Sequence, residues 1–103
     1  MNKNIYVKLF LNASPLKAFV FFPNKQKNII TNSENIISLL LDVFDFISKS
    51  KMDYPITLFS GEVILTNILN EHKDILKTDN KWKDVCNYIV EKNMRLQAYT
   101  MLE

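Results

Sequence analysis

Strict alternation of side-chain character marks the first structured segment of this chain, residues 5–12. The odd-numbered positions are all apolar and contain Ile5, Val7, Leu9 and Leu11. The even-numbered positions are amphipathic and contain Tyr6, Lys8 and Phe10. Successive side chains of a strand point to opposite faces of a sheet. The pattern therefore predicts a strand with one face in a core and the other against a less apolar surface.

Two further strand-like segments follow this first one closely. The turn cluster Asn12-Ala-Ser-Pro15 precedes the run Lys-Ala-Phe-Val-Phe-Phe at residues 17–22. Asn and Pro both favour turn geometry, so we expect an antiparallel hairpin. Residues 27–31 predict a short third strand that completes a meander.

The remaining chain alternates between helical and strand-like patterns. Thr31-Asn32-Ser33-Glu34 is typical of a capping box and precedes an apolar segment, residues 35–49, whose polar stripe contains Ser38, Asp42, Asp45 and Lys49. Residues 54–60 predict a strand, and residues 65–76 predict two short helices or one kinked helix. We expect Asp79 or Asn80 to cap a last helix, whose apolar stripe contains Trp82, Val85, Cys86, Ile89 and Val90. Residues 95–102 predict the closing strand.

This order predicts an α/β fold with a single mixed five-stranded sheet, made of a three-stranded antiparallel meander plus two further strands, and about three helices. The length of 103 residues predicts one domain, residues 1–103. A single Cys cannot form an internal disulfide, and one Cys with one His cannot build a usual zinc site. We expect no cofactor.

The apolar stretches are too short to span a bilayer, and the N-terminus does not resemble a signal peptide. We therefore expect a cytoplasmic protein, in the host cytoplasm if it is viral. The abundance of Asn, Lys and Ile is typical of AT-rich genomes, including those of phages. The net charge of +2 argues neither for nor against nucleic-acid binding.

The predicted element order resembles the ribonuclease H-like fold family. The resemblance rests on three short sequence segments: Thr31-Asn32-Ser33, the run from Leu58 to Ile68, and Asn80-Lys81-Trp82. The first stands where the family opens its central helix, the second where its fourth strand runs into a helix, and the third where its penultimate helix begins.

The resemblance also shows where this chain departs from the family. The family holds two divalent metals with about four carboxylates. The first three positions correspond here to Asn12, Ile36 and Gly61, and the fourth belongs to a helix beyond the point where the sequence stops at Glu103. The resemblance therefore implies a degenerate, non-catalytic member, and we expect no enzyme activity.

A rival hypothesis places a non-standard metal site at Glu34, Asp42, Asp45 and Glu62. It predicts a metal-dependent nuclease or a nucleic-acid-binding protein. Glu34 and Glu62 lie two and one residues from the family's positions, and Asp42 and Asp45 share one helix stripe. A solvated helix edge is the simpler interpretation of that stripe.

Two groups of residues are candidate binding residues. The basic segment contains Lys73, Lys77, Lys81 and Lys83, although Asp74, Asp79 and Asp84 are interleaved with these lysines. The aromatic group contains Tyr6, Phe10, Phe19 and Phe21, which would form an apolar patch if one face of the meander is uncovered. His72 is expected at the surface or its boundary, and Cys86 in the core.

These observations favour a protein-interaction module over an enzyme. We expect a protein partner, with a second copy of the chain as a possible one and nucleic acid as a weaker alternative. One concrete version is a phage or mobile-element accessory protein that inhibits a host defence nuclease, as anti-CRISPR proteins do.

Overall fold

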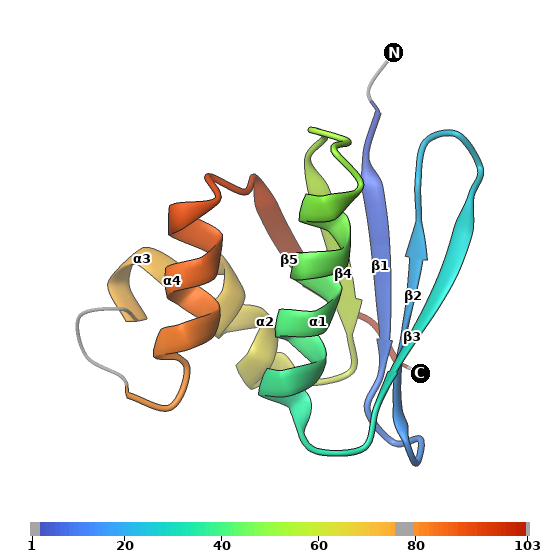
Figure 1. Ribbon diagram of the computed structural model, residues 1–103. Helices are drawn as coiled ribbons and strands as arrows, with labels where there is room; N and C mark the ends of the chain where they lie inside the picture. The colour runs from blue at the N-terminus through green and yellow to red at the C-terminus, as the bar shows by residue number, and fades with distance from the viewer. Residues whose placement is uncertain (1–2, 76–79, 103) are drawn as a thin grey trace.

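The computed structural model describes residues 3–75 and 80–102, and its centre is one mixed five-stranded sheet (Figure 1). The strands are β1 (Ile5–Phe10), β2 (Leu16–Phe21), β3 (Lys27–Asn32), β4 (Ile56–Ser60) and β5 (Leu96–Thr100). Their order across the sheet is β3-β2-β1-β4-β5. The pairs β1–β2 and β2–β3 are antiparallel, whereas β1–β4 and β4–β5 are parallel. The predicted meander and mixed sheet are confirmed, with strand ends shifted by one or two residues.

The helices that the structure describes all lie on one side of this sheet (Figure 1). They are α1 (Ile36–Lys49), α2 (Val63–Asn70), α3 (His72–Ile75) and α4 (Lys83–Glu91). The expected number of about three becomes four, because the helical region after β4 breaks at Glu71 and leaves α3 as a single turn. Within the described residues, no helix is long and apolar enough to cross a bilayer.

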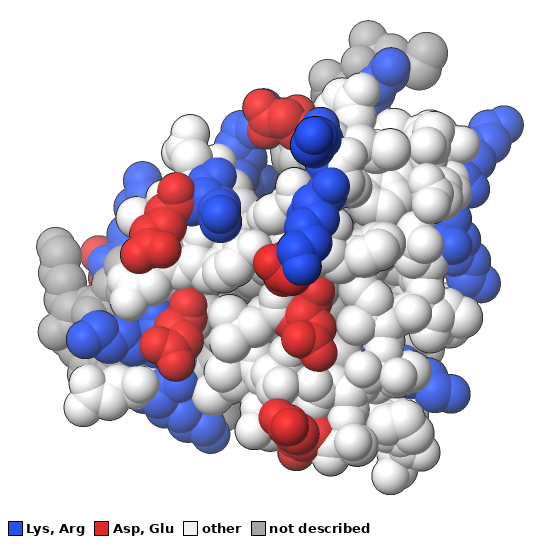
Figure 2. Space-filling view, viewed as in Figure 1, with Lys and Arg blue, Asp and Glu red and all other residues white. Residues whose placement is uncertain are grey.

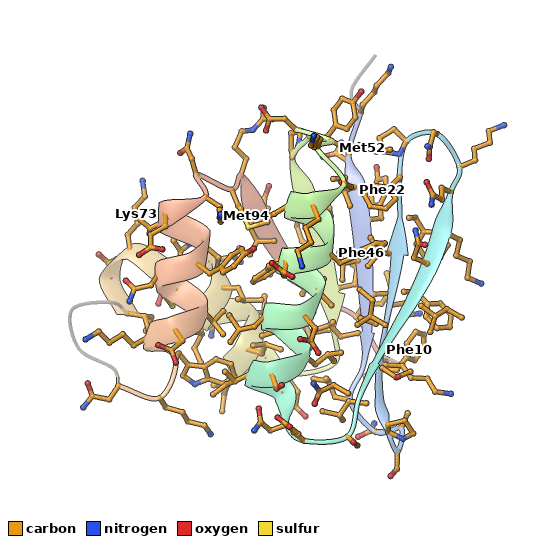
Figure 3. All side chains as sticks on the ribbon, in the orientation of Figure 1. Phe10, Phe22, Phe46, Met52, Lys73 and Met94 are labelled. Carbon is orange, nitrogen blue, oxygen red and sulfur yellow. The ribbon has the colours of Figure 1, made fainter. Side chains whose placement is uncertain are left out.

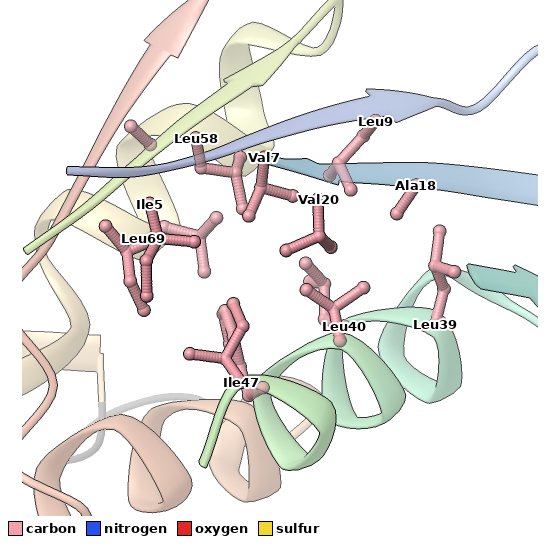
Figure 4. Close-up of a cluster of buried hydrophobic side chains, with 14 of the residues drawn as sticks. Ile5, Val7, Leu9, Ala18, Val20, Leu39, Leu40, Ile47, Leu58 and Leu69 are labelled. Atoms are coloured by element: carbon pink, nitrogen blue, oxygen red, sulfur yellow. The ribbon is translucent and has the colours of Figure 1, made fainter. Parts of the chain in front are cut away.

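The core lies between the sheet and the helices (Figure 4). The sheet contributes the side chains at alternate strand positions, including Ile5, Val7, Leu9, Ala18, Val20, Ile56, Leu58 and Ala98. The first helix contributes Leu39, Leu40, Val43, Phe44 and Ile47. Helix α4 packs against α1, where the rings of Phe44 and Tyr88 stack with centroids 6.3 Å apart. The fourth helix therefore extends the helical layer and does not cover the opposite side of the sheet.

The start of α1 differs from the predicted capping box. Thr31 and Asn32 belong to β3, and Asn35 is the N-cap, whose side chain accepts a hydrogen bond from the Ser38 amide at 2.8 Å. The Asn32 side chain accepts from the amides of Glu34 and Asn35 instead. Because β3 extends through Asn32, the helix begins later and Asn35 becomes its N-cap. Asn caps a helix as well as a hydroxyl side chain does.

Helix α4 also begins later than predicted. Its N-cap is Trp82, without a side-chain capping bond, so Asn80 does not cap it, and Asp79 lies outside the described residues. Val90 was expected in the apolar stripe but is 43% exposed, because it lies on the side of α4 that faces away from the core. Val85, Cys86 and Ile89 are buried as predicted.

The β5 edge of the sheet is closed by the end of α2. The side-chain amide of Asn70 donates to the Ala98 carbonyl at 2.9 Å and accepts from the Ala98 amide at 2.8 Å. The hydroxyls of Thr66 and Thr100 also lie 3.0 Å apart. These contacts satisfy backbone groups that an edge strand otherwise presents to another chain.

One-sided burial predicts unequal costs for substitutions on the two faces of the sheet. Leu58→Ala removes a fully buried side chain, and we expect it to lower the free energy of unfolding by about 2–5 kcal/mol. Tyr6→Thr removes a half-exposed ring, and we expect a cost within about 1 kcal/mol. Urea denaturation of both variants measures the difference. Equal costs would contradict the one-sided arrangement.

Candidate binding face

The side of the sheet away from the helices is formed by the second parity of the five strands. We name it the open face. Its residues are Tyr6, Lys8 and Phe10 from β1; Lys17, Phe19 and Phe21 from β2; Lys27, Ile29 and Thr31 from β3; Thr57 and Phe59 from β4; and Gln97 and Tyr99 from β5. The strand register sets these side chains in rows across the sheet. One row reads Ile29, Phe19, Lys8, Phe59, Tyr99.

Aromatic rings form most of the apolar surface of the open face. Phe10 and Phe19 lie 4.9 Å apart between ring centroids, and Phe19 and Phe21 are 6.4 Å apart in an edge-to-face arrangement. On the other side of β1, Phe59 and Tyr99 stack at 6.0 Å. Such ring pairs stabilise neighbouring strands.

The exposure of these rings shows that no described helix or loop covers this face. Tyr6 is 46% exposed, Tyr99 45% and Phe21 37%, whereas Phe10 and Phe19 are half-buried against their neighbours. The structure thus brings together all four of the aromatic residues that the sequence singled out. It adds Phe59 and Tyr99, which the sequence analysis missed. The sequence did indicate them, because Phe59 and Tyr99 directly follow the core residues Leu58 and Ala98 and so lie on the opposite face of their strands.

A shallow groove of about 450 Å³ crosses the open face beside β1. It is lined by Tyr6, Val7, Lys8, Phe21, Phe59 and Met101. Its exposed lining is apolar. The groove can therefore accept a flat or branched apolar group, with the Lys8 ammonium available for a charged neighbour.

Lysine side chains lie among the aromatic rings of the open face. The Lys27 ammonium sits 4.7 Å from the Phe19 ring centroid and 5.8 Å from that of Phe21. The Lys8 ammonium sits 5.3 Å from the Phe10 centroid. Cation–π attraction of this kind holds the ammonium groups over the rings.

The open face has no negative side chain to oppose these lysines. None of the five described strands contains Asp or Glu, and the first acidic residue of the sequence is Glu34. Figure 2 views the helix side, where basic and acidic residues are mixed over the helices. At the β2–β3 edge, on the right, the charged residues in view are all basic. The charged strand positions of the open face are therefore all lysines, whereas the helix side carries charges of both signs.

The predicted basic segment lies on the helical layer and is separate from the open face. Lys73, Lys81 and Lys83 are exposed, with Asp74 and Asp84 beside them, and Lys77 lies outside the described residues. Figure 3 places Lys73 beside α3 and Phe10 beside the strands at the opposite end of the molecule. The structure does not bring the two candidate groups together.

Two of the four carboxylates of the rival metal site, those of Asp42 and Asp45, bind other side chains. Asp42 accepts a hydrogen bond from the Asn32 side chain at 2.9 Å. Asp45 pairs with the Lys49 ammonium at 2.8 Å, and this hydrogen bond holds the pKa of Asp45 below its ordinary value. Glu34 and Glu62 are exposed at the starts of two different helices. Among the described residues, no group of three or more His, Cys, Asp or Glu side chains could hold a metal ion.

Three residues are matched to family carboxylates through the sequence resemblance alone: Asn12, Ile36 and Gly61. Asn12 follows β1, Gly61 follows β4, and Ile36 is the half-buried first residue of α1. Cys86 is buried, as expected. His72 is half-buried, with its Nδ1 atom 2.9 Å from the Leu69 carbonyl oxygen. That contact ties the imidazole to α2.

No protein-family model matches this chain, and no curated protein sequence matches it. The ribonuclease H-like assignment therefore gains no support from sequence similarity.

Adding divalent metal tests whether the dispersed carboxylates form a site. We expect Mg²⁺ and Mn²⁺ to leave the amide chemical shifts of Glu34, Asp42, Asp45 and Glu62 unchanged, because hard cations need several oxygen ligands around one point. NMR titration measures this response. Localised shifts with Mg²⁺, or localised line broadening with paramagnetic Mn²⁺, that saturate in roughly the millimolar range would establish the rival metal site.

Proposed function

We propose that this chain is a non-catalytic binding protein with a ribonuclease H-like fold, which docks its partner on the open face of its sheet. The observation that carries the proposal is the uncovered sheet face with its exposed rings. Contiguous exposed apolar surface on a small protein usually marks a binding site. The groove beside Tyr6 and Phe21 gives that surface a concave centre.

The order of the elements supports the fold assignment. A meander, a central helix, a fourth strand, further helices and a last strand follow one another as in the family that the sequence resembles. The loss of catalysis rests on the residues at the strand ends, because Asn12 and Gly61 stand where two metal-binding carboxylates are expected. Neither Glu62 nor Asp42 belongs to a group of three or more described side chains that could hold a metal ion.

A protein partner is the version of this function that the sequence favoured. Its most concrete form is a phage or mobile-element accessory protein in the host cytoplasm that inhibits a host defence nuclease, as anti-CRISPR proteins do. The partner's surface would then be apolar and acidic, because the open face offers rings and lysines together.

A second copy of the chain is a less well supported partner. Placing two open faces together would bring Lys8, Lys17 and Lys27 of both copies into one interface. No carboxylate of the described strands is available there to neutralise them. Desolvating unpaired charge costs more than the apolar contact returns.

The alternative function is nucleic-acid binding, with or without metal-dependent cleavage. The observation that favours binding is the lysine content of the open face, with Lys8 and Lys27 held over aromatic rings. Cleavage has no comparable support among the described carboxylates.

Substitution on the open face tests the docking proposal. We expect Tyr6→Ser with Phe21→Ser to abolish inhibition of a defence nuclease that the natural chain inhibits, because the groove loses two of its three aromatic lining residues. Val63→Ser with Ile64→Ser is the matched control, since these apolar residues are 58% and 72% exposed on α2. A cleavage assay of the nuclease with each variant gives the readout.

Either of two results would contradict the proposal. The first is inhibition that the α2 variant loses and the open-face variant keeps. The second is Mn²⁺-dependent hydrolysis of RNA, DNA or hybrid substrate by the chain itself, removed by Asp42→Asn or Glu62→Gln.

A further inference from the structure

The chemistry of the open face narrows the kind of partner that it fits. Its exposed rings offer flat apolar surface, and the only charged side chains on its strand positions are Lys8, Lys17 and Lys27. The partner must therefore present apolar planes and negative charge a few ångströms apart, because Lys8 and Lys27 lie on strands next to the strand that carries Phe19 and Phe21.

We propose that the open face binds single-stranded nucleic acid, with bases stacked on its exposed rings and phosphates paired with its lysines. This inference rests on the proposed docking role of the open face, and it assigns to that face the nucleic-acid alternative in place of a protein partner. Sequence-tolerant single-strand binding combines a basic surface with aromatic stacking platforms. The open face supplies both on one flat sheet.

Tyr6, Phe21 and Tyr99 are the stacking positions. Each is more than one third exposed. Tyr6 and Phe21 are cross-strand partners and line the groove, so a base can lie between them with its neighbour over Phe59 and Tyr99. Aromatic stacking contributes about 1–3 kcal/mol per base in single-strand complexes.

Lys8 and Lys27 are the phosphate-binding positions nearest these rings. Lys8 lies at the groove, and its ammonium is held over Phe10 on the same strand. Lys27 is the cross-strand neighbour of Phe21, and its ammonium lies over Phe19 and Phe21. The ammonium groups thus stand beside the stacking rings, where the backbone of a stacked strand must pass.

The same geometry disfavours a duplex. The bases of a duplex are stacked on one another, so their flat surfaces are not accessible to the rings. A duplex could use only the three lysines, and three phosphate contacts give weak binding. The open face is therefore expected to prefer single strands to duplexes of the same length.

Fluorescence anisotropy with labelled oligothymidylate and oligouridylate of about 15 nucleotides tests the inference on the whole chain. We expect saturable binding whose logarithmic affinity falls with the logarithm of salt concentration with a slope of about −2, since three lysines each contribute about −0.7. A fourfold increase in salt then lowers the affinity roughly twentyfold.

Four variants assign the site. We expect Tyr6→Ala to weaken binding about tenfold or more, and Tyr6→Trp to retain it, because stacking needs a ring and not the hydroxyl. Lys8→Gln should make the salt slope shallower by about 0.7. Lys73→Gln on the helical layer is the matched control and should change neither quantity. Circular dichroism confirms that each variant is folded.

Three results would overturn the inference. They are no binding at low salt, equal affinity for single strand and duplex, or binding that Lys73→Gln removes while Tyr6→Ala leaves it unchanged. The first would leave the docking proposal intact with a protein partner. Cleavage of the bound strand in Mn²⁺ would instead overturn the non-catalytic function and leave single-strand binding standing.

Discussion

Packing of α1 against one face of the sheet is the interaction on which the rest of the structure depends. Leu40, Val43 and Phe44 are fully buried in the common core, and α1 packs against β2 and β3. The helix crosses from the β3 edge to β4, so the same packing sets the parallel alignment of β1 and β4. Helix α4 then extends this layer by packing on α1. As a result, the described helices all lie on one side of the sheet.

The open face follows directly from this arrangement. With α2 closing the β5 edge through Asn70, the second side of the sheet is the large surface left without cover. A bare sheet face with exposed rings is an aggregation hazard. Lys8 and Lys27, held over the rings, raise the cost of pairing with another copy. Under the proposed function, the same lysines would favour partners with negative charge.

The sequence predicted the elements better than their arrangement. Alternation at Ile5, Val7 and Leu9 was sufficient to predict β1 and its buried parity, because the period of two is a local property. The capping box at Thr31 was wrong, because Asn35 is an equally good cap and β3 extends through Asn32. Local pattern alone does not decide between neighbouring caps.

The binding face could be predicted only in part for a similar reason. Tyr6, Phe10, Phe19 and Phe21 have the right parity in the sequence, but parity does not say whether a second helical layer covers them. Phe59 and Tyr99 join them only when β4 and β5 are placed beside β1, which depends on long-range pairing. The basic segment at Lys73 is evident in the sequence, yet its distance from the face is a property of the fold.

The central claim is that helices cover one side of the sheet and leave the other accessible. Solvent paramagnetic relaxation from a soluble gadolinium chelate measures this directly on side-chain protons. The structure predicts strong relaxation of the Tyr6, Phe21 and Tyr99 ring protons and weak relaxation of the Leu9 and Val20 methyl protons. Equal protection of both sets would contradict the account, because something would then cover the open face.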